Sequence, residues 1–287
     1  MRYARWTAAI LLGLGLGSPS GATSILGVDT SNPYPRLWRI DGETGDVVEG
    51  PQITGLGLQR YEFLLDIDQE PSSGLVYGLT TRGNLFTIDP NSGISRGIGT
   101  NANFVSEGDI SFNPKDGRLY ALGRDNQCCG PYYFKLFTLS LTDGTATPIA
   151  SLDPTAPGPN SFFDLSGLAF DQEGGLFALD TASSRFLTID PITGDILRIT
   201  DAHYEDGVSA NLGASIAGFD YDSASNRFIT RTSSQLFAAD PRTGLVVEVG
   251  AASSLSVAGL AVIPEPTTVA LMGLGLAALA GPLSRRG

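Results

Sequence analysis

Histidine and cysteine are almost missing from this chain of 287 residues, which contains one histidine and two cysteines. Cys128 and Cys129 are adjacent, so they build neither a framework of several disulfides nor a Cys/His metal cluster. A Ser-His-Asp triad would require His203, yet no serine stands out as a nucleophile, and one histidine in a polar loop is typical of a solvated side chain. The sequence therefore indicates no catalytic residues.

Positive charge is scarce as well, because Lys115 and Lys135 are the only lysines and arginine supplies the rest. All 30 acidic residues but only 14 of the 18 basic residues lie between positions 23 and 266, so this segment has a net charge of −16. Such a charge repels nucleic acid and anionic lipid headgroups. We therefore expect no nucleic-acid partner, whereas divalent cations would be attracted.

Long amphipathic helical patterns are also absent. Glycine is abundant, with 36 residues, and the predicted turns are rich in Asn, Asp, Ser and Pro. The segment from residue 23 to residue 263 is long enough to bury a substantial core as one large all-β domain.

The N-terminus has the three parts of a secretory signal peptide. Two arginines among the first five residues precede an apolar stretch over residues 8–16, and the small residues Ser20 and Ala22 suit the −3 and −1 positions of a cleavage site. We therefore predict a signal peptide at residues 1–22 and an exported mature chain.

The C-terminus also has three parts. Pro264-Glu265-Pro266 is followed by an uncharged apolar run of 17 residues over positions 267–283, and Arg285 and Arg286 stand at the end. A run of this length is at the short end of what crosses a bilayer core as a helix. The two arginines favour the cytoplasmic side.

This tail resembles the PEP-CTERM sorting signal of Gram-negative bacteria. The resemblance implies that residues 264–287 form a motif, a transmembrane helix and a basic end that an exosortase recognises and processes. It further implies a transient anchor in the inner membrane, followed by delivery to the cell surface or extracellular matrix of bacteria that make exopolysaccharide. Gly273, Gly275 and Pro282 within the apolar run suit such a transient anchor.

The segment between the two ends repeats itself five times. In each repeat an alternating strand runs into a turn that contains glycine, and the residue at the end of that strand recurs at spacings of 48, 51, 50 and 50. Glycine supplies the positive φ that lets the chain fold back. The strands are Leu37–Asp41, Leu85–Asp89, Leu136–Ser140, Phe186–Asp190 and Leu236–Asp240. The turn glycines are Gly45, Gly93, Gly144, Gly194 and Gly244.

Each repeat contains four strands in about fifty residues, which is typical of a β-propeller blade. The first repeat lacks its first strand, and an extra one, Gly259–Ile263, follows the last repeat. We therefore predict an all-β, five-bladed β-propeller over residues 23–263, closed by this C-terminal strand and followed by the transmembrane sorting helix. A solenoid is the rival architecture, but it would need capping repeats. The body resembles β-propeller repeat proteins, and this resemblance fixes no activity.

Aligning the first strands of the repeats separates two groups of acidic residues. One group stands where each strand ends, and an Asx side chain there caps the following turn. Its members are Asp68, Asn113, Asp171 and Asp222. In the same alignment Asp66 and Asp220 share a position in mid-strand near the axis, where an unpaired carboxylate is costly to bury. They either line a wet channel or hydrogen-bond to neighbouring backbone.

If they line a channel, these two carboxylates form a candidate cation site with three further acidic residues. Oxygen ligands of this kind suit a hard cation such as Ca²⁺. The candidate ligands are Glu62, Asp66, Glu107, Asp109 and Asp220. No Asp-rich loop of the EF-hand type is present.

Two further features lie in the connections. Cys128 and Cys129, in the long insertion over residues 123–133, form either a vicinal disulfide that clamps the loop or two free thiols. Aromatic residues in the connections either stack on sugar rings or cover the blade faces. These aromatic residues are Tyr34, Tyr61, Tyr132, Tyr133, Phe162, Phe163 and Tyr204.

Taken together, these features predict an exported β-propeller of the cell envelope or extracellular matrix. We expect a non-catalytic binding or scaffold module associated with exopolysaccharide, with an exosortase, the inner membrane and envelope components as partners. The alternative is a polysaccharide-acting hydrolase with carboxylates at the propeller channel. For the hydrolase, Asp66, Glu107, Asp109 and Asp220 would have to converge.

Overall fold

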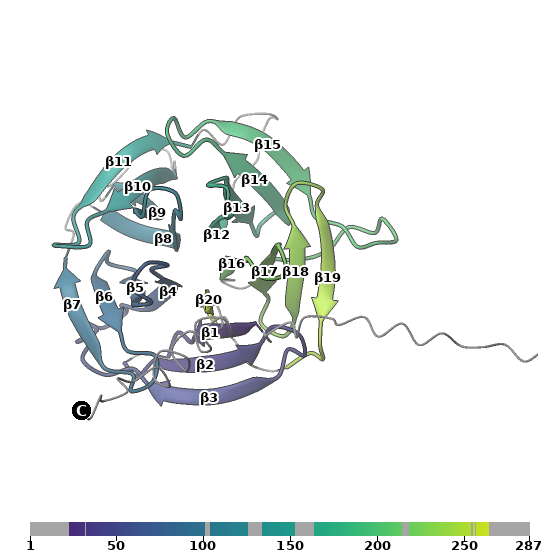
Figure 1. The fold of residues 1–287 in the computed structure, drawn as a ribbon. Helices are drawn as coiled ribbons and strands as arrows, with labels where there is room; N and C mark the ends of the chain where they lie inside the picture. The colour runs from purple at the N-terminus through teal and green to yellow at the C-terminus, as the bar shows by residue number, and fades with distance from the viewer. Residues whose placement is uncertain are drawn as a thin grey trace, which may run out of the picture.

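The computed structural model describes residues 23–31, 33–100, 104–125, 134–152, 164–213, 218–253, 255 and 257–263. Within these residues twenty β-strands form five antiparallel sheets of four strands each. The five sheets stand around a common axis as the blades of a propeller (Figure 1). The predicted all-β, five-bladed propeller is confirmed.

The strands of each blade follow one another from the axis outwards. Blade 1 contains β20 (Gly259–Ile263), β1 (Ser24–Val28), β2 (Arg36–Asp41) and β3 (Val47–Gln52). Blade 2 contains β4 (Leu64–Gln69), β5 (Val76–Thr80), β6 (Leu85–Ile88) and β7 (Ser95–Gly99). Blade 3 contains β8 (Phe104–Phe112), β9 (Leu119–Asp125), β10 (Lys135–Leu139) and β11 (Ala146–Ser151). Blade 4 contains β12 (Leu165–Phe170), β13 (Leu176–Asp180), β14 (Arg185–Ile189) and β15 (Ile196–Asp201). Blade 5 contains β16 (Phe219–Asp222), β17 (Arg227–Arg231), β18 (Leu236–Asp240) and β19 (Leu245–Val249).

The last strand closes the ring, as the missing first strand predicted. Strand β20 pairs antiparallel with β1, so that Ser24 lies opposite Ile263 and Val28 lies opposite Gly259. The innermost strands β4, β8, β12, β16 and β20 contact one another in turn around the axis. Blade 1 is therefore built from both ends of the described chain, and β1 is not left as an exposed sheet edge.

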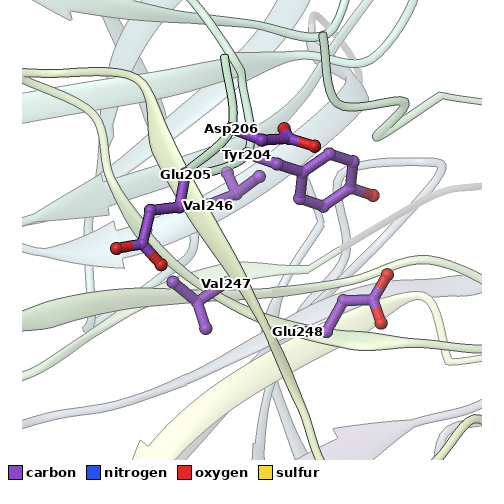
Figure 2. Close-up of a pocket in the computed structure, with 6 residues that line it drawn as sticks. All are labelled: Tyr204, Glu205, Asp206, Val246, Val247 and Glu248. Atoms are coloured by element: carbon purple, nitrogen blue, oxygen red, sulfur yellow. The ribbon is translucent and has the colours of Figure 1, made fainter. Parts of the chain in front are cut away.

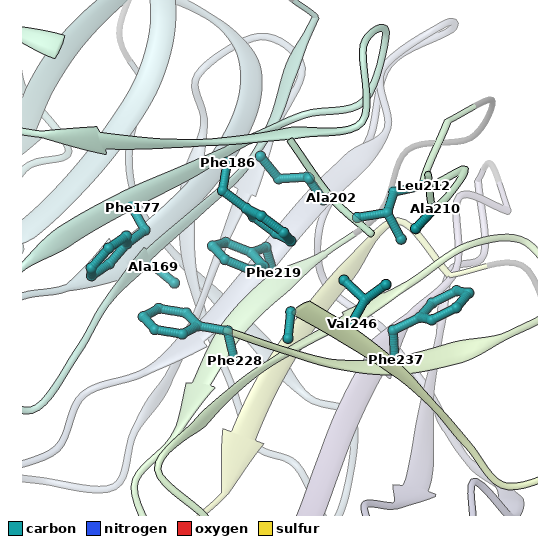
Figure 3. Packing of buried hydrophobic residues seen from close by; sticks show 12 residues of the cluster. Ala169, Phe177, Phe186, Ala202, Ala210, Leu212, Phe219, Phe228, Phe237 and Val246 are labelled. Atoms are coloured by element: carbon teal, nitrogen blue, oxygen red, sulfur yellow. The ribbon is translucent and has the colours of Figure 1, made fainter. Parts of the chain in front are cut away.

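The hydrophobic core is divided among the five junctions between blades. Each junction has its own cluster of buried side chains in the described part of the chain. Because successive residues of a strand point to opposite faces, one strand serves two junctions. In β13, Ala178 faces blade 3 and Phe177 faces blade 5. Phe228 packs against both Phe177 and Phe219, with ring centroids 4.9 and 5.1 Å apart (Figure 3).

The recurring turn glycine has two structural reasons. All five of these glycines have a positive φ, between 71° and 86°. Each also lies against the end of the outer strand of the preceding blade. A Cβ on Gly93 would lie 2.2 Å from the carbonyl oxygen of Gln52, and one on Gly244 would lie 2.2 Å from that of Asp201. The repeat motif thus encodes the contact between blades as well as the turn.

The predicted signal peptide and sorting signal lie outside the described residues. Within the described ranges, no helix has the length and apolar character needed to cross a membrane. The last described strand, β20, ends at Ile263, directly before the Pro264-Glu265-Pro266 motif.

Candidate functional site

Polar side chains on the inner strands join neighbouring blades along the axis. Each side chain accepts a hydrogen bond from a backbone amide of the next inner strand around the ring. The donor–acceptor pairs are Ile110 and Asp66 (2.8 Å), Leu168 and Asp109 (3.3 Å), Phe112 and Asp68 (2.6 Å), Phe170 and Ser111 (3.1 Å), and Val262 and Asp220 (2.6 Å). Both Asp66 and Asp220 thus hydrogen-bond to neighbouring backbone, one of the two arrangements expected for them, and Asp220 also lines a cavity.

The sequence alignment assigned Asp68 to the turn after the first strand, but in the structure Asp68 lies within the strand. Strand β4 continues to Gln69, and Glu70 takes the turn position, where its amide donates to Leu75 and its carbonyl accepts from Gly74. The sequence offers two carboxylates before the turn, and only the hydrogen-bonded register shows which one is used. The other three predicted turn residues do accept a bond from the amide two residues later, namely Asn113, Asp171 and Asp222.

The observed register also changes which axial residues are equivalent. Asp66 corresponds to Asp109, whereas Asp68 corresponds to Ser111 and Asp220. The predicted equivalence of Asp66 and Asp220 is therefore wrong by two residues. The axis consequently contains two layers of polar groups, with Asp66 and Asp109 in one layer and the other three residues in the next.

At two places along the axis the backbones of neighbouring inner strands approach each other directly. Gly259 occupies the position of Asp66 in blade 1, and a Cβ on it would lie 2.5 Å from the Cα of Asp66. A Cβ on Gly218 would lie 2.2 Å from the amide nitrogen of Leu260. Glycine is thus required at both positions by the backbone contact between blades.

Burial raises the pKa of the axial carboxyls. The pKa values of Asp66, Asp68 and Asp109 lie well above the ordinary range, first because of burial and further because neighbouring carboxylates repel their charge. The pKa of Asp220 rises to about 7, again mainly through burial, and the charge of Asp222 adds to the rise. One oxygen each of Asp66 and Asp109 is buried without a hydrogen-bond partner. The cluster is therefore able to hold protons near neutral pH.

A cavity of about 230 Å³ opens at the end of the axis where the inner strands finish. Asp68, Ser111 and Asp220 line it, together with Tyr221 and Asp171, and the last of these is ion-paired with Arg242. Within the described ranges, no three His, Cys, Asp or Glu side chains are grouped as metal ligands. The Ca²⁺ site stays a prediction from the sequence.

Glu62 lies at the opposite end of β4 and does not join this cavity. It is buried, and its carboxylate accepts bonds from the amide of Gln59 (3.0 Å), the hydroxyl of Thr80 (2.7 Å) and the side-chain amide of Asn84. This carboxylate therefore fixes the loop that precedes β4.

The loop that Glu62 holds presents Tyr61 to solvent. Tyr61 has φ of 62°, a conformation that is strained for a bulky residue, and its side chain is 70% exposed. The guanidinium of Arg60 lies 4.7 Å from the centre of its ring. Strain at an exposed aromatic residue, held by a buried carboxylate, marks this position as a candidate binding residue.

A second open site lies on the outer edge of blade 5. The segment after β15 runs beside β19, where the amide of His203 donates to Gly244 and the amide of Val246 donates to His203, both at 2.9 Å. His203 thus has a backbone role, and its Nδ1 lies 3.2 Å from the carbonyl oxygen of Asp201. The groove between this segment and β19 has a volume of about 510 Å³ (Figure 2). It is lined by Tyr204, Glu205, Asp206, Val246, Val247 and Glu248.

Several predicted residues are not described by the structure. Glu107 lies in strand β8, but its side chain is outside the described part. Also outside are Cys128, Cys129, Tyr132, Tyr133, Phe162, Phe163, Pro264, Glu265, Pro266, Arg285 and Arg286. Sequence reasoning missed the axial role of Asp68 and the acidic residues of the groove. The long connection between β15 and β16 was the available signal for the groove.

The strand pairing, the axial hydrogen bonds and the closure by β20 define this chain as a five-bladed β-propeller. A family model described as a domain of unknown function (DUF4394) matches residues 36–127. No curated protein matches the chain.

Three solved structures illustrate what the chain is similar to. A nidogen/laminin complex has a TM-score of 0.49 at 12% identity, covering 84% of this chain and 98% of its own. A protein of unknown function from Bacteroides caccae has a TM-score of 0.44 at 12% identity, and the match covers 80% of this chain and 73% of that protein's chain. A catalytically inactive virginiamycin B lyase from Staphylococcus aureus, with quinupristin, has a TM-score of 0.42 at 13% identity, and the match covers 80% of this chain and 70% of the lyase chain.

Proposed function

We propose that this propeller is a non-catalytic binding or scaffold module of the cell envelope or extracellular matrix, associated with exopolysaccharide. The observation that carries the proposal is Tyr61, a strained and exposed aromatic residue whose loop is held by the buried carboxylate of Glu62. An exposed tyrosine ring offers a flat apolar surface with a polar end, which suits the C–H face and hydroxyls of a sugar. Holding the ring in place beforehand reduces the entropy cost of binding.

Export and sorting form the second part of the proposal. The signal peptide at residues 1–22 directs the chain across the inner membrane. An exosortase then recognises residues 264–287, whose helix anchors the chain transiently before the protein is released to the surface or matrix. Two observations support this sequence of events: the three-part tail, and a propeller body that ends at Ile263, directly before the motif.

The alternative function is a polysaccharide hydrolase that works at the axial cavity. Asp68 and Asp220 line the same cavity, and a carboxyl with a pKa of about 7 suits a general acid. Against it, each of these carboxylates already accepts a backbone amide of the next blade. We therefore assign the axial carboxylates a structural role, in which they connect neighbouring blades by hydrogen bonds.

The sorting proposal is tested by mapping both termini of the protein in its native host by peptide mass spectrometry. We expect a mature chain that begins near Thr23 and lacks residues 267–287. An intact tail in the inner membrane would refute the processing step.

The binding proposal is tested with purified mature protein and the host's own exopolysaccharide in a sedimentation assay. Tyr61→Ala should abolish most of the binding, whereas Tyr34→Ala, which removes a ring that is 67% exposed, should not. Equal effects of the two substitutions would refute the role of Tyr61. Release of reducing sugar by the wild type, lost in Asp220→Asn, would instead favour the hydrolase.

A further inference from the structure

The groove on blade 5 combines an apolar floor, an aromatic wall and an acidic rim. Val246 is buried, so the apolar surface that remains open to solvent comes from Val247, which is 40% exposed. Glu205 lies on one side of strand β19, whereas Glu248 and the ring of Tyr204 lie on the other (Figure 2). The groove is therefore large enough, and chemically varied enough, to hold one or two sugar rings.

The loop wall of this groove is held in place by hydrogen bonds. His203 pairs with β19 on one side, and the amide of Tyr204 donates to Val208 at 2.8 Å on the other. Asp206 accepts a further bond from the amide of Val208 at 3.0 Å. These contacts fix the wall before any ligand arrives, which lowers the cost of binding.

The charge of the groove determines what it attracts. Its six lining residues include three carboxylates and no basic side chain. Burial raises the pKa of the Tyr204 hydroxyl, and the negative charge of Glu248 raises it further, so Glu248 acts electrostatically on Tyr204. With a net charge of −16 on the segment from residue 23 to residue 266, an anionic sugar would be repelled.

We propose that this groove binds an amino sugar with a free ammonium group, presented by a cationic polysaccharide. The pyranose C–H face lies against Tyr204, and the ammonium group lies beside Glu248, on the same side of β19 as that ring (Figure 2). A cation near the face of the tyrosine ring gains a further attraction. This inference depends on the proposed function, because it names the class of polysaccharide that the module takes, but it places that ligand at a site separate from Tyr61.

Isothermal titration of the mature protein with a glucosamine hexasaccharide tests the inference. We expect binding that weakens with added salt, and at least tenfold weaker binding of the N-acetylglucosamine hexasaccharide and of oligogalacturonate. Glu248→Gln, at an exposed position, should weaken binding by about three- to fivefold, as expected for the loss of one surface charge pair. Tyr204→Leu should weaken it further.

The matched control is Asp46→Asn, which removes an exposed carboxylate from the turn before β3. If it weakens binding as much as Glu248→Gln does, the attraction is unspecific and the inference fails. Hexalysine that binds with the same sensitivity to Glu248→Gln would assign the groove to a basic peptide instead. Binding of host exopolysaccharide through Tyr61 without any binding of the glucosamine hexasaccharide would overturn this inference alone, and binding of neither would overturn the proposed function as well.

Discussion

The axial carboxyls predict that this propeller is most stable in mild acid and loses stability as the pH rises towards neutral. The pKa is raised in the folded chain for three buried aspartates, Asp66, Asp68 and Asp109, and for the partly buried Asp220. A raised carboxyl pKa means that the folded state binds more protons than the unfolded state. The resulting stability is complete below the unfolded pKa, about 3.9, and declines as the pH rises through the folded value.

The size of the effect follows from Asp220. Its pKa rises from the ordinary value of 3.8 to about 7. At about 1.36 kcal/mol per pH unit, this group alone contributes at most about 4 kcal/mol between pH 4 and pH 7. For a domain of roughly 150–250 residues, about 2–4 °C of melting temperature corresponds to each kcal/mol, so we expect a fall on the order of 10 °C.

Turn aspartates act in the opposite direction at lower pH. Backbone hydrogen bonds lower the pKa of Asp41 and Asp89, so their contribution is present above the unfolded pKa and is lost in stronger acid. The two groups of carboxyls together place the stability maximum near pH 4–5. This is below the range of about pH 5–8 that is common for proteins.

Thermal unfolding followed by circular dichroism at pH 4.5, 6.0 and 7.5 measures the effect. Asp220→Asn should reduce the difference in melting temperature between pH 4.5 and pH 7.5, since an amide does not titrate. Asp46→Asn should keep the wild-type difference. A melting temperature that is constant or rises from pH 4.5 to pH 7.5 would refute the reasoning.

Three further predictions concern the joints and turns. Gly259→Ala should cost about 1–3 kcal/mol, because the new Cβ would lie 2.5 Å from the Cα of Asp66, and an unchanged melting temperature would contradict that close approach. Phe228→Ala should cost about 3–5 kcal/mol in urea unfolding, since the ring packs against blade 4, and Phe228→Leu should cost clearly less. Asp89→Ala should cost only about 1 kcal/mol, because its exposed carboxylate accepts the amides of Asn91 and Ser92, and a loss as large as that of Phe228→Ala would show a further role.

The number of blades and their closure were predictable because they depend on local signals. A glycine with positive φ is needed in every turn, so Gly93 and its four equivalents recur in the sequence with little variation in spacing. The missing first strand and the surplus strand Gly259–Ile263 are likewise visible without a structure. Ring closure follows from them, since an unpaired edge is unfavourable.

The axial register was less predictable, because it is decided by contacts between blades. Asp68 resembles a turn residue in sequence, but its carboxylate reaches the amide of Phe112 in the next blade. The groove depends on how the segment after β15 lies along β19, which no repeat pattern encodes. Tyr204 was recognised as a loop aromatic, whereas its partner Glu248 comes from a strand 44 residues later.

The pairing of β20 with β1 also decides how a tethered molecule would be oriented. Ser24 lies opposite Ile263, and Val262 lines the axial cavity, so strand β20 ends at the rim where this cavity opens. A propeller tethered at the end of β20 would direct the cavity towards the supporting surface and the loop of Tyr61 away from it. The strand that closes the ring would also bear the mechanical load, and tension on the tail would pull first on the pair formed by Ile263 and Ser24.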